Sequence, residues 1–256
     1  MIVFRRGRVY TDFCYYKSGR NGFPMSELKS NEGKNEVIEV DGVKWSRLPI
    51  KTHVVTDADD IAEVALKYAG PELRDGDILF ISEKCVACTQ KRAIKMEDIK
   101  PRRLAVMLSK HVTKTPHGIG LGIPETMEMA LRECGTFRIL LAAFCSVIGK
   151  LLHKKGWFYV VAGPKASSID GPCHNTLPPY NHYVVLGPSD PDETARRIAK
   201  AVGQKVMIID LNDLGGNILG TSDQSIDREW AVRTLKDNPL GQSHEQTPMG
   251  ILRKAE

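Results

Sequence analysis

Apolar residues are grouped into short segments along the chain, and the residues that flank each group predict helices and strands. Ile61, Ala65 and Tyr68 recur at helical spacing after an acidic start, Thr56 to Asp60, which is typical of a helix N-terminus. Further helices are expected from Pro101 to Val112, after Pro124, and from Ser189-Asp-Pro191 to Gly203. Short apolar runs predict buried strands at Ile78–Ile81, Trp157–Ala162 and Lys205–Leu211.

Residues 137–153 are apolar almost all round, which predicts a helix that is buried or lies at an interface. The most apolar part, Ile139 to Ile148, is bounded by Arg138 and Lys150 and is far shorter than the ~20 residues that span a bilayer. The chain start has no charged-then-apolar leader, and the scattered cysteines do not form a disulfide framework. We therefore expect a cytoplasmic protein that makes no contact with a membrane.

The remaining pattern indicates the fold class and a division of the chain. Asp41-Gly42 lies between two apolar stretches and predicts a two-residue hairpin. Helices and strands alternate without a regular βαβ rhythm, which favours an α+β fold with mixed sheets and packed helices. We expect an N-terminal extension with the hairpin at residues 1–47 and a main domain at 48–256.

Composition and charge narrow the function classes. With 42% hydrophobic and 26% charged residues among 256, the chain can bury a sizeable core. A chain that is disordered throughout, or a coiled coil throughout, is therefore excluded. The net charge of +5 is unevenly spread, and residues 134–165 hold five basic side chains and no acid. Such patches attract anions, but a solvated surface that binds no ligand would have the same distribution of charged residues. Nucleic acid is not expected, because no zinc-finger spacing, aromatic RNA-binding signature or long basic helix is present.

Polar clusters follow two of the predicted strands and are the first candidates for chemistry. Ser82, Glu83 and Lys84 follow Ile81, and a lysine there can pair with phosphate as a compact charge; an exposed loop is the alternative. Asp210-Leu-Asn212-Asp213 ends another strand, and its oxygen ligands suit Mg²⁺ or Mn²⁺, with an Asx turn as the alternative.

Two further polar runs, at residues 163–171 and 241–248, are candidate site loops, and the first is expected to leave a strand. Two other motifs are weak. Gly118-Ile-Gly120-Leu-Gly122 lacks the spacing of a phosphate loop, and Cys85-Val-Ala-Cys88 lacks the second ligand pair of a zinc site.

Taken in order, these stretches resemble the coenzyme F-420:L-glutamate γ-ligase family. The resemblance covers roughly residue 48 to the end, while residues 1–47 and much of 135–156 look like additions. The motifs that carry it are Leu48-Pro-Ile-Lys-Thr-His-Val-Val55, Asp75-Gly-Asp-Ile-Leu-Phe-Ile81, Val160-Val-Ala-Gly163 with Ala166-Ser167, Ser189-Asp-Pro-Asp192, Ile209-Asp-Leu-Asn212, and Leu240-Gly-Gln with Thr247-Pro248.

The resemblance implies an α+β fold in an intertwined homodimer. It also implies a GTP-dependent ligase that uses Mn²⁺ or Mg²⁺ to add L-glutamate to a deazaflavin coenzyme precursor through an acyl phosphate. By the same resemblance, Lys165 and Asp210 are the expected catalytic residues, and Asp210 and Gln242 the metal ligands. The expected nucleotide-binding residues are Lys51, Thr52, His53, Val54, Glu83, Lys84, Arg92 and Ser168.

The chain departs from the family pattern at three of these places. Lys165 stands where the family has a metal-binding aspartate, Leu211 replaces a threonine, and Cys88 replaces a nucleotide-contacting lysine. Two other function classes therefore stay open. One is a non-catalytic member of the family that binds an anionic ligand or a nucleotide, and the other is a nucleic-acid binder.

Overall fold

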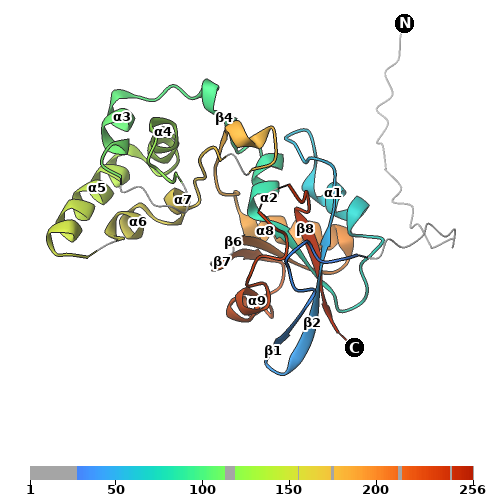
Figure 1. Cartoon of the computed structure of the whole chain (residues 1–256). Coiled ribbons are helices and arrows are strands. Elements are labelled where there is room, and N and C mark those ends of the chain that lie inside the picture. Colours follow the sequence, from blue (N-terminus) through green and yellow to red (C-terminus); the bar gives the residue numbers. More distant parts are fainter. Residues whose placement is uncertain are drawn as a thin grey trace, which may run out of the picture.

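A computed structural model describes residues 28–112, 119–154, 156–173, 176–212, 215–242 and 244–255. These residues form two lobes (Figure 1). The sheet lobe comprises the described residues of 28–90 and 189–255, and the helical lobe those of 103–167. Residues 91–102 and the described part of 168–188 connect the two lobes.

The sheet lobe is built on one mixed, six-stranded sheet in the order β1-β2-β8-β3-β6-β7. Strands β3 and β6 run parallel, and the other neighbouring strands are antiparallel. The strands are β1 (Val37–Val40), β2 (Val43–Ile50), β3 (Ile78–Ser82), β6 (Lys205–Asn212), β7 (Gly215–Thr221) and β8 (Met249–Lys254).

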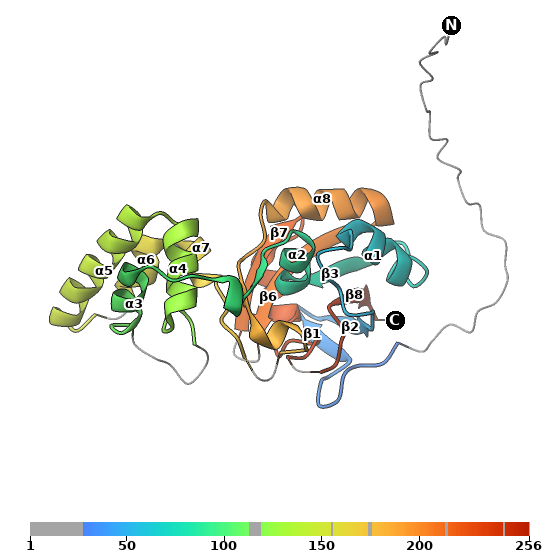
Figure 2. The same ribbon diagram turned by 90° about the horizontal axis from the view of Figure 1, so that it is seen from above.

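Alternating side chains of the sheet form a core on each of its two faces. Leu79 and Ile81 pack beneath α1 (Ile61–Tyr68), α2 (Glu83–Thr89) and α8 (Pro191–Val202). Ile78 and Phe80 point the other way, toward α9 (Arg228–Thr234). Figure 2 shows α1, α2 and α8 together over one side of the sheet. Because β3 is buried on both faces, its residues Ile78–Ile81 are all apolar.

The predicted hairpin is confirmed, and it forms one edge of this sheet. Asp41 and Gly42 connect β1 to β2 with φ angles of 53° and 75°, the two positive values of a type I′ turn. Strand β2 crosses residue 47 without a break and pairs with β8. The hairpin is therefore an integral part of the sheet, while the division of the chain into domains at residue 47 stays a prediction.

The helical lobe has a core of its own. It consists of α3 (Arg103–Ser109), α4 (Pro124–Glu133), α5 (Thr136–Leu151), α6 (Trp157–Ala162) and α7 (Pro164–Ser167). Leu121, Met127 and Ile139 are almost completely buried there. The lobe is connected to the sheet by a small antiparallel pair, β4 (Ala93–Lys95) with β5 (Tyr183–Val185), and by the turns η1 (Met96–Asp98) and η2 (Tyr180–His182).

The predicted strand at Trp157–Ala162 is wrong, because these residues form helix α6. Gly156 has a φ of 88° and reverses the chain, and Trp157 then packs so closely on α5 that a Cβ at Gly149 would lie 3.1 Å from its ring. Short apolar runs fit either a strand or a buried helix, and here packing against α5 decides. The polar run at 163–171 therefore leaves a helix and includes α7.

The other predicted elements are confirmed, with small changes of their ends. Asp60 caps α1 by accepting hydrogen bonds from the N–H groups of Ala62 and Glu63. Gly203, with a φ of 76°, ends α8. The predicted helices after Pro101 and Pro124 are α3 and α4, and the apolar segment at 137–153 is α5.

Within the described residues, no single helix is long and apolar enough to cross a membrane. Helices α4 and α5 reach the necessary length and composition only as a pair, which is bent by 118°.

Candidate active site

Glu83 and Asp210 lie side by side at one edge of the sheet because β3 and β6 are parallel and in register. Ser82, the last residue of β3, pairs with Ile209, so Glu83 at the start of α2 lies beside Asp210, which is still part of β6 and pairs with Asn217 of β7. The carboxyl ends of parallel strands are where α/β sheets commonly bind ligands.

The backbone around Asp210 is shaped by its neighbour β7. A β-bulge between Ile208 and Ile209 precedes Asp210, and bulges of this kind reorient the side chains that follow. Gly216 of β7 lies so close that a Cβ there would be 2.0 Å from the carbonyl oxygen of Asp210. A glycine is therefore required opposite Asp210.

Glu83 is a buried carboxylic acid in an acidic environment. Its exposed fraction is 5%, and its Oε2 atom is buried without a hydrogen-bond partner among the described residues. Burial, together with the negative charges of Asp210 and Asp170, raises the pKa of Glu83 to about 9. Burial and the charge of Asp170 also raise the pKa of Asp210. Three carboxyl groups therefore lie close together at the carboxyl ends of β3 and β6, and a bound cation would reduce the repulsion between their negative charges.

Lys84 supplies one positive charge to this cluster. Its Nζ lies 2.9 Å from Oδ2 of Asp170, a residue of the connecting segment. Although partial burial lowers the pKa of Lys84, the nearby carboxylates of Asp170, Glu83 and Asp210 raise it overall. Lys84 therefore stays protonated at neutral pH, as binding to a phosphate would require.

Arg92 and Lys165 approach the cluster from the connecting segment and the helical lobe. Both contact Glu133 at the end of α4, Arg92 through Nη2 at 2.7 Å and Lys165 through Nζ at 3.6 Å. Arg92 also donates a hydrogen bond from Nε to the carbonyl oxygen of Gly187. One carboxylate thus holds two predicted site cations together.

Ser168 lies next to Gly187, and both residues belong to the segment that connects the two lobes. A Cβ added to Gly187 would be 2.7 Å from Cβ of Ser168 and 3.6 Å from Oε1 of Glu83. Ser168 donates from its hydroxyl to the carbonyl oxygen of Pro164. Gly187 therefore lies close to both Glu83 and Ser168, and a side chain at this position would not fit.

The predicted residues at 51–54 are held in place by a separate set of contacts. His53 bridges α1 and the loop before it, since its Nδ1 lies 2.9 Å from the hydroxyl of Tyr68 and its Nε2 lies 3.0 Å from Oδ1 of Asp59. The backbone N–H of Thr56 and the contact with His53 lower the pKa of Asp59, although burial opposes them. Both ring nitrogens of His53 are therefore engaged within the protein.

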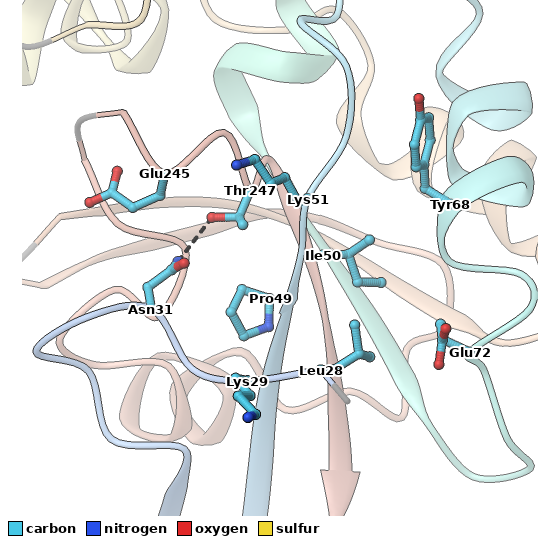
Figure 3. A pocket seen from close by; sticks show the side chains of 10 residues that line it. All are labelled: Leu28, Lys29, Asn31, Pro49, Ile50, Lys51, Tyr68, Glu72, Glu245 and Thr247. Atoms are coloured by element: carbon cyan, nitrogen blue, oxygen red, sulfur yellow. Dashed lines mark hydrogen bonds between the residues drawn. The ribbon is translucent and has the colours of Figure 1, made fainter. Parts of the chain in front are cut away.

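Thr52 and Lys51 lie beside the C-terminal loop that precedes β8. Thr52 exchanges two hydrogen bonds with Gln246, one through the backbone of each residue and one from the Gln246 side chain. Lys51 lines a cavity of about 450 Å³ together with Tyr68 and Thr247 (Figure 3). Val54 is partly buried next to this group. The cavity offers polar and charged groups of both signs to a ligand.

The assignment of Asp210 and Gln242 as metal ligands stays a prediction. Gln242 is exposed, and no hydrogen bond or ion pair joins it to Asp210 within the described part of the chain. Among those residues, no group of three or more His, Cys, Asp or Glu side chains is arranged to hold a metal ion. Asp213, Ser243 and Gly118, which belong to predicted motifs, lie outside the described residues.

The structure adds three residues to the prediction. Asp170 and Glu133 pair with predicted cations, and Asp59 orients His53. Asp170 was visible in the polar run at 163–171, but Glu133 and Asp59 carry no sequence signal beyond an acid near the end or the start of a helix.

Comparison with known proteins decides the family. Residues 49–220 match the family described as F420-0:Gamma-glutamyl ligase, and this span includes Glu83, Asp170 and Asp210. The chain belongs to this family.

Two curated relatives carry the name coenzyme F420:L-glutamate ligase. The protein of Methanopyrus kandleri is 26% identical over 231 residues, which cover 78% of this chain and 82% of the relative. The protein of Methanothermobacter thermautotrophicus is 26% identical over 163 residues, which cover 61% of this chain and 56% of the relative.

Proposed function

We propose that this protein is a ligase that forms a γ-glutamyl amide bond between the carboxylate of a coenzyme F-420 precursor and L-glutamate, with GTP as the source of energy. The observation that supports it best is the pairing of Glu83 with Asp210 at the carboxyl ends of β3 and β6, inside the span that matches the family. The names of the two curated relatives support the same reaction.

The proposed reaction has two steps. The acceptor carboxylate attacks the γ-phosphorus of GTP, which gives an acyl phosphate and GDP. The amine of glutamate then attacks the acyl carbon, loses a proton, and expels phosphate as the amide forms. Phosphoryl transfer of this kind depends on positioning and on neutralising negative charge. Lys84 and Lys165 carry suitable charges, and Arg92, held by Glu133, completes the cationic side of the site.

We propose that Mn²⁺ or Mg²⁺ binds at Asp210. The donor set fits in its chemistry, because hard divalent cations prefer carboxylate oxygens and Oε2 of Glu83 is buried without a partner beside Asp210. A bound cation would supply positive charge opposite the nucleotide phosphates. Gln242, which is exposed, is proposed as the second ligand.

The nucleotide-binding roles of Lys51, Thr52, His53, Val54, Glu83, Lys84, Arg92 and Ser168 are part of the proposal. Lys84 and Ser168 lie at the acidic edge of the sheet, whereas Lys51 lines the cavity in Figure 3. The imidazole of His53 would act by fixing the loop, because both of its nitrogens are already engaged. A homodimer, as the resemblance implies, is likewise proposed.

The direct test is a product assay with purified protein, GTP, Mn²⁺, L-glutamate and the coenzyme F-420-0 acceptor. The proposal predicts GDP, phosphate and an acceptor heavier by one glutamyl residue, and no phosphate release when the acceptor is omitted. ATP replaces GTP in a parallel reaction to define the base preference. Absence of product with either nucleotide and either metal would contradict the ligase assignment.

One observation favours the alternative function, a family member that binds an anionic ligand without catalysis. Lys165 stands where the family has a metal-binding aspartate, and its Nζ pairs with Glu133. This alternative predicts that ligand binding is unchanged by a chelator and that no phosphate is released.

A further inference from the structure

Four arginines around helix α4 are anchored to the chain in the same way. In each of them the Nε atom donates a hydrogen bond to an acceptor of the protein itself, and the four are Arg92, Arg102, Arg132 and Arg138. A guanidinium group has five N–H donors, so an arginine anchored through Nε still has Nη donors for a ligand. Anchoring also fixes the direction of the side chain, which lowers the entropy that is lost when a ligand binds.

Glu128, in the middle of α4, organises the first two of these arginines. Its side chain is almost completely buried, and its carboxylate accepts from Nε of Arg102 at 3.0 Å and from Nε of Arg132 at 2.8 Å. Although burial raises the pKa of Glu128, the hydrogen bonds from the two arginines lower it overall, so the carboxylate is charged at neutral pH. Nη2 of Arg102 and Nη1 of Arg132 make no hydrogen bond within the described part of the chain, and both side chains are half-exposed.

Glu133, the last residue of α4, organises a second pair of cations, Arg92 and Lys165. It lies five residues after Glu128, which is about 7.5 Å further along the helix axis. Nε of Arg92 is bound to the carbonyl oxygen of Gly187, a residue that borders the candidate site. Figure 2 shows α4 and α7 on the side of the helical lobe that faces the sheet lobe. This second pair therefore lies next to the candidate site, and the first pair lies further away along α4.

Arg138, near the start of α5, adds a fifth cation. Its Nε donates to the carbonyl oxygen of Val161 at 2.9 Å, and its Nη2 would lie 2.6 Å from a Cβ at Gly163, two residues before Lys165. We call Lys165 and the four arginines the cation row. Its five positive charges are held by two carboxylates, which leaves a surplus of three. Residues 91–103, which include part of the row, contain six basic and two acidic residues, so they do not offset this surplus.

We propose that the cation row binds the carboxylates of a γ-glutamyl chain carried by the acceptor. The inference rests on the ligase function proposed above, because each glutamyl unit in such a chain keeps its α-carboxylate and the chain presents a series of negative charges. The Nη donors of anchored guanidinium groups match carboxylate oxygens in geometry and charge. The reacting end of the acceptor lies at the edge of the sheet beside Glu83 and Asp210, and the units already added lie along α4.

The test measures the binding of a fluorescent tetra-γ-L-glutamate to the full chain by anisotropy, at low and at moderate salt. The variants are Arg132→Gln and the double variant that adds Arg138→Gln. Arg196→Gln is the matched control, since Arg196 is a similarly exposed arginine on α8 that pairs with Glu193. The proposal predicts a dissociation constant about threefold higher in Arg132→Gln, about tenfold higher in the double variant and unchanged in the control. Added salt should weaken binding more for the parent than for the double variant.

Two further variants keep the result interpretable. Thermal unfolding checks each protein, because Arg132 also satisfies the buried carboxylate of Glu128. If Arg132→Gln does not fold, Arg138→Gln alone repeats the test with the same threefold expectation, since Arg138 is anchored by a backbone carbonyl group. Arg132→Lys keeps the charge without the planar guanidinium group, so its affinity should lie between those of the parent and Arg132→Gln.

The proposal is overturned if the parent does not bind tetra-γ-glutamate, if the arginine variants bind it as the parent does, or if the control loses as much affinity as they do. A single-stranded oligonucleotide of the same charge that binds more tightly, and loses this in Arg132→Gln, would also overturn it and assign the cation row to nucleic acid. The binding test needs no turnover, whereas the ligase proposal is judged by product formation, so the failure of one is distinguished from the failure of the other.

Discussion

The two lobes bury their apolar side chains to different extents. In the sheet lobe, helices cover both faces of the sheet, and Phe80, Met207 and Ile208 are inaccessible. In the helical lobe, the core is small and the outer helices face outward. Among the described residues, the exposed large apolar side chains other than Val37, Leu66 and Met96 lie between residues 106 and 160.

The comparison separates what each lobe contributes. The sheet lobe fixes Glu83 and Asp210 by strand register, so their placement depends on a core that is complete within one chain. The helical lobe contributes Glu133 and Lys165 from its inner side and an uncovered surface from its outer side. The sheet lobe therefore positions the paired carboxylates, whereas the helical lobe contributes Lys165 and leaves apolar side chains uncovered.

The largest expected effect on stability comes from a matched pair of phenylalanines. Phe80→Ala empties a fully buried position and should cost about 3–5 kcal/mol, whereas Phe144→Ala should cost less than about 1 kcal/mol in the monomer. Urea unfolding at a protein concentration low enough to keep the chain monomeric measures both. Equal losses would mean that Phe144 is packed as tightly as the sheet core.

The next largest effect is on activity. Asp210→Asn removes a charge at the edge of the sheet and should lower the ligase rate at least about a hundredfold while the melting temperature changes little. The control is Asp223→Asn, since Asp223 is a half-exposed carboxylate that pairs with Lys205 at the other end of β6. Activity that survives in Asp210→Asn would show that the metal and catalytic assignments are misplaced.

The dependence of stability on pH tests whether Glu83 is protonated in the folded chain. The pKa of Glu83 is about 9 in the folded chain, against an ordinary value of 4.5, so the unfolded chain releases this proton at lower pH than the folded one. Stability from Glu83 is therefore complete below about pH 4.5 and decreases as the pH rises toward 9.

Glu83→Gln removes this dependence. With a chelator present, the melting temperature of the variant relative to the parent should rise between pH 5 and 9, by a few degrees. Mn²⁺ should shrink this difference, because a cation near Glu83 favours its charged form. A difference that is constant with pH would show that Glu83 titrates normally.

The smallest effect concerns a helix cap in the sheet lobe. Asp60→Ala removes two hydrogen bonds at the start of α1 and an ion pair with Arg197, and should cost about 1 kcal/mol. Thermal unfolding would show a decrease of about 2–4 °C.

The sequence predicted the sheet lobe better than the helical lobe, for a physical reason. Buried strands such as Ile78–Ser82 and capped helices such as α1 are encoded locally, by apolar runs and by the capping residue. At Trp157–Ala162 the local signal is ambiguous, and contact with Gly149 on α5 decides for a helix. Long-range packing of this kind is not visible in a single sequence.

Some residues of the candidate site could be predicted from the sequence, and others could not. Glu83 and Lys84 follow the end of β3, Asp210 lies near the end of β6, and the parallel pairing of these strands brings the polar side chains together. Glu133 and Asp59 could not be found, because their roles depend on which cation the fold places next to them.

The most direct test of the central claim is nucleotide binding at the Glu83–Asp210 edge, measured by thermal shift with GTP and either Mn²⁺ or a chelator. A ligand at a hundred times its dissociation constant stabilises a fold by about 2.7 kcal/mol, which is roughly 5–10 °C for a chain of this size. The account predicts this shift for the parent protein with GTP and Mn²⁺, and its loss with chelator or in Asp210→Asn. A shift that persists under both conditions, or no shift at all, would contradict it.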